Sequence, residues 1–301
     1  MSSIKKVLIA GASGTLGQST LAEFLRVEQF DVFVLTRPDS KKTFPDSVGV
    51  LKTDYSPQSL GEVFSSQKFD AVVSLLNRSI GSEVERALIN ASKTAGVKRF
   101  IPSDFGNDLA NPEVLSLCSW FSPKAKIVDY LKELESGSFT WSALITGPFF
   151  DWGLQNHGFD FDFKARKFTK YEGSTPFTVT NVGTITKALV NLLSDSERLR
   201  DTANKRVYIS THLLTQDKLL SAVEKVTGAT FEVLQVSLEE TERKARESLA
   251  SGDMVGAFGL AKVALFKNSY GDFSKKQSNE LLGLPQGDLE ADLKKYVNPI
   301  L

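Results

Sequence analysis

The first half of the chain alternates short apolar runs with amphipathic segments. Six runs of four to eight residues predict strands, at 5–10, 31–36, 48–51, 69–76, 97–103 and 141–146. Between them, apolar residues recur at helical spacing, notably over 18–25, 82–95 and 124–134. Runs that are apolar on both faces are typical of parallel strands covered by helices on each side. We therefore expect an α/β fold, a Rossmann-type doubly wound parallel sheet, over residues 1–150.

After residue 150 the pattern changes. Residues 151–175 are rich in Phe, Lys, Asp and Gly without a clean period, so we expect an insertion that covers a site. A helical pattern at 182–193 and a strand at 206–210 predict that 176–211 returns to the sheet. The remainder is mainly helical, at 216–227, 238–251 and 254–267, with a strand at 230–236 and an amphipathic close at 281–299. Residues 151–175 and 212–301 should form a smaller, mainly helical substrate-binding lobe.

Three glycines mark the passage from the first strand to the first helix. They are spaced three apart, in the pattern G-x-x-G-x-x-G instead of the usual G-x-G-x-x-G. Glycines allow close approach of a pyrophosphate, and a helix N-terminus offers it free N–H groups and partial positive charge. A glycine-rich turn that binds nothing is the alternative. The candidate cofactor residues here are Gly11, Ser13, Gly14, Thr15, Leu16 and Gly17.

The end of the second strand favours NADP(H) as the cofactor. In dinucleotide folds a carboxylate at this position holds the ribose 2′-OH of NAD, whereas an Arg suits the 2′-phosphate of NADP. Arg37 ends the strand and Lys42 follows closely, while Asp31 lies at the wrong end of the strand. Asp39, in the same loop, is the counter-argument, and a solvated basic loop is the alternative.

Further cofactor contacts are expected at the carboxyl ends of the fourth and fifth strands, where open parallel sheets bind ligands. Leu76 and Asn77 follow the fourth strand, and Ser103 and Phe105 follow the fifth. Ser103 would either polarise a carbonyl or satisfy local backbone groups.

Composition excludes several classes of partner. Lys+Arg and Asp+Glu both number 36, so the net charge is zero and nothing suggests nucleic acid. No apolar run approaches the ~20 residues of a membrane span, and the N-terminus leaves no room for a signal peptide. The single cysteine, Cys118, excludes an internal disulfide and predicts a cytoplasmic protein. His157 and His212 lie far apart, so we expect no metal site.

Four segments resemble the NmrA-like and isoflavone-reductase-like group of atypical short-chain reductases. They are GASGTLG, LTRPDSKK, FIPSDFGND and SPKAKIVDYL, and the resemblance covers essentially the whole chain. It implies bound NADP(H) and a lysine, here Lys124, that acts near the nicotinamide as general acid/base or holds the cofactor ribose. It also implies that the loop at Phe105 packs beside the nicotinamide. Asp104 stands where the plant enzymes usually have Glu, and Ile127-Val-Asp-Tyr replaces their basic run, so their phenolic substrates are not carried over.

The residues themselves also single out Lys124 as the catalytic candidate. Common short-chain dehydrogenases use Tyr-x-x-x-Lys, but no tyrosine of this chain has a lysine four places on. Lys124 begins a predicted helix, where burial, the positive helix end and Lys126 would lower its pKa toward neutrality. A solvated lysine at a helix start is the alternative.

Substrate contacts are expected after the sixth strand. Phe149, Phe150 and Trp152 would form an apolar substrate wall or seal the interface between the lobes. His157, in the expected insertion, would hydrogen-bond a substrate or serve only as a surface or packing residue.

These features predict an NADPH-dependent reductase, acting as a monomer or homodimer, that reduces an enone, imine or carbonyl. Its substrate would be small, largely apolar and of the secondary-metabolite kind, with hydride from the cofactor. Two alternatives stay open: a redox-silent NADP-binding sensor, and an isomerase or cyclase on the same fold. Lys124 favours an enzyme over the sensor.

Overall fold

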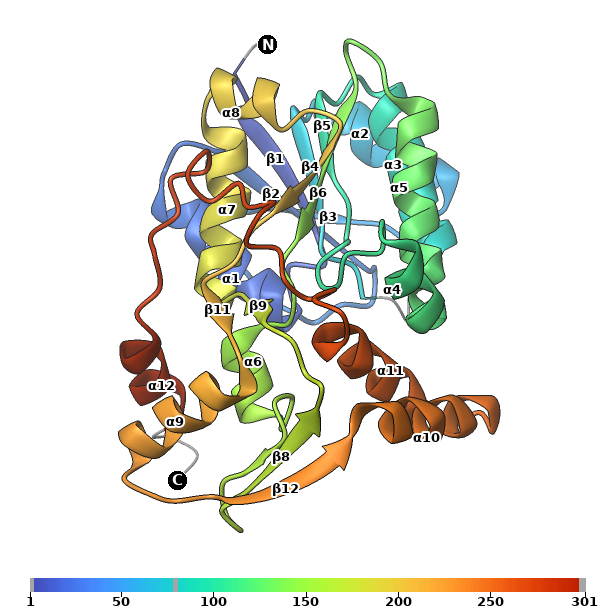
Figure 1. Cartoon of the computed structure of the whole chain (residues 1–301). Helices are drawn as coiled ribbons and strands as arrows, with labels where there is room; N and C mark the ends of the chain where they lie inside the picture. The colour runs from blue at the N-terminus through green and yellow to red at the C-terminus, as the bar shows by residue number, and fades with distance from the viewer. Residues whose placement is uncertain (1–2, 78–80, 298–301) are drawn as a thin grey trace.

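A seven-stranded parallel sheet is the centre of the computed structural model, which describes residues 3–77 and 81–297 (Figure 1). From β1 the chain steps outward to β2 and β3, then crosses back to β4 and continues in the other direction. The reversal leaves a topological switch point between β1 and β4, where doubly wound sheets bind ligands. The predicted fold class is confirmed. The strands are, in sheet order, β10 (Lys205–Tyr208), β6 (Thr140–Ile145), β5 (Arg99–Ile101), β4 (Ala71–Ser74), β1 (Lys6–Ala10), β2 (Asp31–Thr36) and β3 (Gly49–Lys52).

Helices cover both faces of this sheet (Figure 1). One layer contains α1 (Thr15–Arg26) and α7 (Val182–Ser194). The other contains α2 (Pro57–Ser66), α3 (Ser82–Thr94) and α5 (Ser122–Leu134). Alternate residues of β1 divide between the two cores, because successive side chains of a strand point to opposite faces. The apolar character of β1 on both faces follows from this double burial.

Local signals fix several helix boundaries. The hydroxyl of Ser56 accepts a 3.2 Å hydrogen bond from the Ser59 N–H, and Pro57 is the first helical residue of α2. Gly96 follows α3 with φ of +78°, the left-handed conformation that often ends a helix.

Arg99 of β5 is 1% exposed and joins three elements. Its guanidinium donates to the hydroxyls of Thr140 (2.9 Å) and Ser142 (2.7 Å) on β6. It also donates to the Thr202 hydroxyl at 3.0 Å and to the carbonyl of Leu199, which lies in α8 (Ser196–Asp201). Burial lowers the pKa of Arg99 to about 10. These contacts fasten the sheet to the segment that follows α7.

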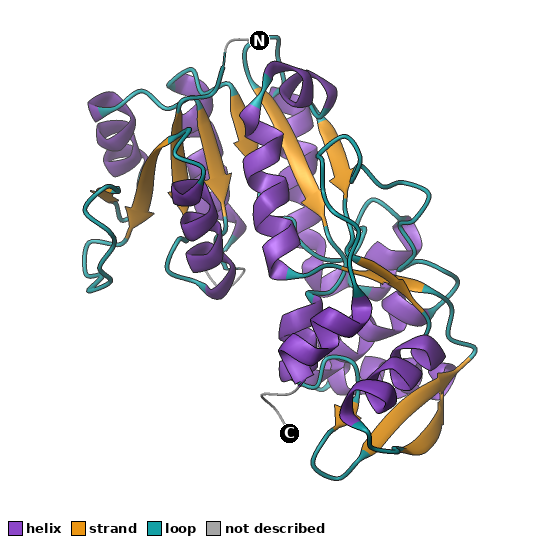
Figure 2. Cartoon of the chain, turned by 90° about the vertical axis from the view of Figure 1, so that its left-hand side faces the viewer, coloured by secondary structure: helices purple, strands orange, loops and turns teal. Residues whose placement is uncertain are grey.

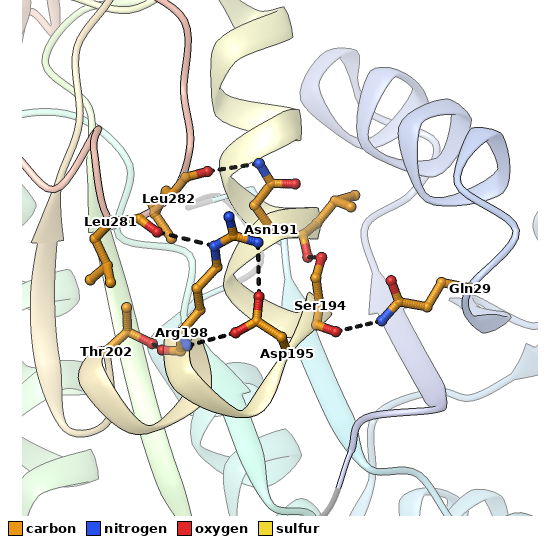
Figure 3. A network of polar contacts seen from close by, with 9 residues as sticks. Gln29, Asn191, Ser194, Asp195, Arg198, Thr202, Leu281 and Leu282 are labelled. Carbon is orange, nitrogen blue, oxygen red and sulfur yellow. Dashed lines mark hydrogen bonds and ion pairs between the residues drawn. The ribbon is translucent and has the colours of Figure 1, made fainter.

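A second polar network fastens the C-terminal part of the chain to the same helices (Figure 3). Arg198 donates from Nε to the Leu281 carbonyl (3.0 Å) and from Nη1 to Asp195 (2.9 Å). Asn191 of α7 donates to the Leu282 carbonyl at 2.7 Å. Residues 281–282 are therefore held against α7 and α8.

A second lobe lies beyond the carboxyl ends of the main strands, whose arrows point toward it (Figure 2). A three-stranded sheet in the order β12-β8-β7 and several helices build this lobe (Figure 1). None of the helices within 3–77 and 81–297 is long and apolar enough to cross a membrane. The elements of the lobe are α6 (Phe150–Gln155), β7 (Phe161–Asp162), β8 (Lys167–Glu172), α9 (Gln216–Thr227), β12 (Glu232–Ser237), α10 (Leu238–Ala250), α11 (Val255–Phe266) and α12 (Leu289–Val297).

Residues 151–175 differ from the expected covering insertion, because they fold into α6, β7 and β8 and fill the core of the lobe. Phe161 packs on Phe168 with ring centroids 4.5 Å apart and edge-on against Phe231 at 5.4 Å. β7 has only two residues, and β8 has the mainly polar sequence KFTKYE without an alternating burial pattern, which explains why the sequence did not reveal them. The sequence also missed four short elements: α4 (Pro112–Leu117), the 3₁₀ turn η2 (Ser119–Phe121), α8, and β11 (His212–Leu214), which pairs with β9 (Phe177–Val179).

Candidate active site

Two glycines of the turn after β1 lie in close contact with neighbouring backbone. Gly11 has φ of +86°, and a Cβ there would lie 2.5 Å from the carbonyl oxygen of Leu75. A Cβ at Gly17 would lie 2.2 Å from the carbonyl oxygen of Gly11. Both glycines are therefore required by contacts within the chain.

Gly14 is different, because the chain itself leaves room for a side chain there. It is the N-cap residue of α1 with φ of −75°, and a Cβ would meet only the Gly11 oxygen at an ordinary 3.5 Å. The first N–H groups of α1 point outward past this residue, since a helix start leaves them without intrahelical partners. The space in front of Gly14 fits an approaching pyrophosphate. A dinucleotide therefore suits the residues present at this turn.

A pocket of about 480 Å³ lies beside the turn, between α1 and the loop after β2. Ser13 and Lys42 line it, together with Gln18, Lys41 and Phe44. Arg37 lies outside the wall of this pocket with its side chain 74% exposed, and its Nε is 4.0 Å from Asp39. Thr15 is exposed and Leu16 half-buried at the start of α1. The loop thus offers cations beside the turn, with Arg37 held only loosely.

A second pocket, of about 620 Å³, opens at the carboxyl ends of β4 and β5. It brings together four predicted residues, Leu76, Asn77, Ser103 and Lys124, which come from three separate parts of the chain. Its remaining walls come from α3, η2 and α5 and include Gly81, Ser82, Glu85, Ser119, Trp120, Ser122, Pro123 and Ile127. The pocket combines an apolar wall with a lysine and a buried carboxyl group.

Ser103, which lines this pocket, makes two hydrogen bonds with neighbouring segments. Its backbone N–H donates a 2.8 Å hydrogen bond to Oε1 of Glu85, on the buried face of α3. Its hydroxyl donates at 2.9 Å to the carbonyl of Leu76, after β4. Because the hydroxyl proton is already committed, local backbone satisfaction accounts for Ser103 in this structure.

Two buried carboxyl groups face the lysine. Burial raises the pKa of Glu85, while the Ser103 N–H, the nearby Ser74 hydroxyl and the charge of Lys124 lower it. Burial raises the pKa of Asp104 to about 6, against the opposing effect of the charges on Lys124 and Arg206. The Oδ2 atom of Asp104 is buried without a hydrogen-bond partner within the described ranges. The charge of Lys124 therefore acts on two carboxyl groups that burial makes harder to ionise.

The aromatic residues predicted near the site divide into two sets. Phe105 and Phe149 are half-buried and pack against the core between the sheet and the layer of α1 and α7. Phe150 is fully buried, and its ring centroid lies 5.7 Å from that of Phe159. Of the two alternatives for Phe150, the structure therefore supports sealing of the interface between the lobes.

Trp152 and His157 lie on or after α6 and do not line the Lys124 pocket. Trp152 is 49% exposed. His157 is exposed at φ of +57°, and its Nδ1 is 2.9 Å from the Phe161 carbonyl oxygen. The structure therefore gives His157 a local role in the turn before β7.

Glu85 and Trp120 are among the pocket residues that the sequence did not single out as site residues. Glu85 shares the buried face of its helix with Leu88, Ile89 and Ser92, which follow it at helical spacing. An acidic residue in that register is unusual and was the available signal. Trp120 lies in a 3₁₀ turn too short to leave a periodic signal. No group of three or more potential metal ligands occurs among the described residues.

Comparison with known proteins identifies the family. Residues 3–285 match the NmrA-like family, so the chain belongs to it. The chain is 32% identical over 288 residues to the oxidoreductase aprR of Aspergillus flavus, covering 93% of this chain and 94% of that protein. An isoflavone reductase homolog of Solanum tuberosum is 27% identical over 313 residues, covering 98% and 96%. The resemblance inferred from the four sequence segments is thus confirmed.

The fold is shared with a protein of known structure. AtPrR2, solved with NADP⁺ and (+)pinoresinol, superposes with a TM-score of 0.78 at 21% identity, covering 98% of this chain and 100% of that one.

Proposed function

We propose that this protein is an NADPH-dependent oxidoreductase that reduces an enone, imine or carbonyl on a small, largely apolar molecule. The observation that carries the proposal is the position of two features at one sheet edge. The open space at Gly14 follows β1, and the Lys124 pocket follows the neighbouring β4 and β5. A dinucleotide lying across the switch point would extend from the first feature to the second.

Different parts of the chain would bind different parts of the cofactor. The glycine turn and the start of α1 hold the pyrophosphate, and Arg37 with Lys42 selects the 2′-phosphate. Leu76, Asn77, Phe105 and Ser103 shape the groove that leads into the Lys124 pocket. The two relatives named above, from Aspergillus flavus and Solanum tuberosum, carry oxidoreductase or reductase names, which supports this class of activity.

The cofactor supplies a hydride. Lys124 then supplies the proton that balances it, from Nζ to the oxygen, nitrogen or carbon that gains electron density. The apolar wall formed by Trp120, Ile127 and Leu76 keeps water from the reacting atoms and fits an apolar substrate. The second lobe lies across the carboxyl ends of the strands and would complete the substrate site (Figure 2).

The test is NADPH oxidation followed with a panel of aromatic enones, cyclic imines and ketones. The Lys124→Ala variant should lose about 100-fold or more in kcat/KM, the usual contribution of a general acid. Its affinity for NADPH should change little. Lys132→Ala removes an exposed lysine near the other end of the same helix and should leave both quantities unchanged.

Two other outcomes would contradict the proposal. Product formation without net NADPH oxidation would favour an isomerase or cyclase on the same fold. NADPH binding without turnover, with a partner protein recruited only when the dinucleotide is bound, would favour a sensor.

A further inference from the structure

Glu85 lines the same pocket as Lys124, where it can act on the charge of the lysine. It lies on the buried face of α3 and is 7% exposed. Its Oε1 is fixed by the 2.8 Å hydrogen bond from the Ser103 N–H. The carboxyl group therefore has one defined position in the pocket wall.

Burial of this carboxyl group calls for a nearby positive charge. An ionised carboxylate in an apolar environment is costly unless it is paired and hydrogen-bonded. One backbone N–H satisfies part of that requirement, and Lys124 provides the positive charge on the adjacent wall. Across the same space, the carboxylate favours the ammonium form of the lysine.

Among the other charged groups, Asp104 in the loop after β5 also interacts with Lys124. The charges of Lys124 and Arg206 lower the pKa of Asp104 while Glu85 and Asp108 raise it, and Asp104 does not line the pocket. Lys126 and Glu83 are both exposed, one on α5 and one on α3. Asn77 and Trp120 are the uncharged neighbours from the loop after β4 and from η2. Glu85 is therefore the acidic residue of the pocket wall itself.

We propose that Glu85 is a positioning residue that holds Lys124 in its protonated form, ready to donate. This inference rests on the proposed role of Lys124 as the proton donor. The acidic side chain matters through its charge, because a glutamine of the same shape would keep the acceptor for the Ser103 N–H.

The direct readout is the titration of Lys124, measured as the pH dependence of its acetylation by trace acetic anhydride and quantified by peptide mass spectrometry. Glu85→Gln should lower the apparent pKa of Lys124 by about one unit or more, as expected for loss of an opposite charge nearby. Glu83→Gln makes the same chemical change on the exposed face of α3 and should leave the titration unchanged. Glu85→Asp keeps the charge and should stay closer to the wild type than Glu85→Gln.

An unchanged Lys124 titration in Glu85→Gln would overturn the inference. Equal shifts in Glu85→Gln and Glu85→Asp would also overturn it, because packing and not charge would then be responsible. The alkaline limb of the kcat profile should move to lower pH in Glu85→Gln together with the titration. The titration needs no substrate, so a shift of Lys124 in a protein that never oxidises NADPH would contradict the proposed function while still showing that the charge of Glu85 keeps Lys124 protonated.

Discussion

A Cβ at Gly17 would lie 2.2 Å from the carbonyl oxygen of Gly11, so the two ends of the glycine turn close on each other. Gly14, between them, has no comparable neighbour in the chain. The three glycines therefore serve two purposes: the outer two allow the turn to form, and the middle one keeps its outer surface open to a ligand.

Substitution should separate these purposes. Gly14→Ala should cost at most about 1 kcal/mol of stability, because φ of −75° suits any residue and only N-cap preference is affected. It should weaken NADPH binding by 10-fold or more. Gly17→Ala should lower the melting temperature by several degrees, because the new methyl overlaps backbone. Thermal unfolding and fluorescence titration measure the two effects, and equal loss of stability in both variants would contradict the distinction.

Arg37 should determine the preference for NADPH over NADH. Its weak 4.0 Å contact with Asp39 leaves it available to a 2′-phosphate. Arg37→Ala should reduce NADPH affinity by roughly 10- to 100-fold and change NADH affinity little, as expected for one charge-assisted contact. Arg26→Ala, an exposed arginine at the far end of α1, is the control. A wild-type protein that binds NADH as tightly as NADPH would exclude this role.

Asp104 should make the protein less stable as the pH rises. Burial raises its pKa to about 6 in the folded state, against 3.8 for the free side chain. Because the folded-state pKa lies above that of the unfolded chain, the folded protein keeps a proton that the unfolded chain has released. The stability that this proton provides is fully present below pH 3.8 and is lost as the pH rises through 6. Asp104→Asn removes the titration. Between pH 5 and pH 8 the wild type should lose about 1 kcal/mol relative to the variant in urea unfolding. A difference that is independent of pH would contradict the assignment.

Arg99 should be essential for stability although it lies away from the site. Arg99→Met would remove four hydrogen bonds from a fully buried position and should cost about 2–4 kcal/mol in free energy of unfolding. Arg200→Met removes an exposed arginine and should cost less than about 0.5 kcal/mol. Urea unfolding compares the two variants, and a similar small cost for both would show that the buried network contributes little.

The parts of this structure that sequence predicts are those with local causes. Ser56 and Pro57 start α2 through short-range hydrogen bonding and a fixed φ, and Gly96 ends α3 through its left-handed conformation. The parallel sheet follows from the alternation of strands and helices, because strands joined by crossover helices pair in parallel. The glycine turn and Lys124 were visible for the same reason, since each stands at a boundary between elements.

What sequence could not provide depends on contacts between distant segments. Phe161 lies in a strand of two residues and Phe168 in one without an alternating pattern, and Phe231, which packs on Phe161, comes from far along the chain. Glu85 becomes a pocket residue only because α3 lies against the end of β5, where Ser103 binds it. Its register beside Leu88 and Ile89 indicated burial, but not what it would face.

The central claim is that a nicotinamide dinucleotide extends from Gly14 to the Lys124 pocket, and protection of Lys124 from acetylation tests it most directly. NADP⁺ should protect Lys124, while the exposed Lys126 on the same helix should react at an unchanged rate. Adenosine 2′,5′-bisphosphate carries only the half that binds Arg37 and should leave Lys124 unprotected. If saturating NADP⁺ leaves the reactivity of Lys124 unchanged, or protects both lysines equally, the cofactor does not reach this pocket.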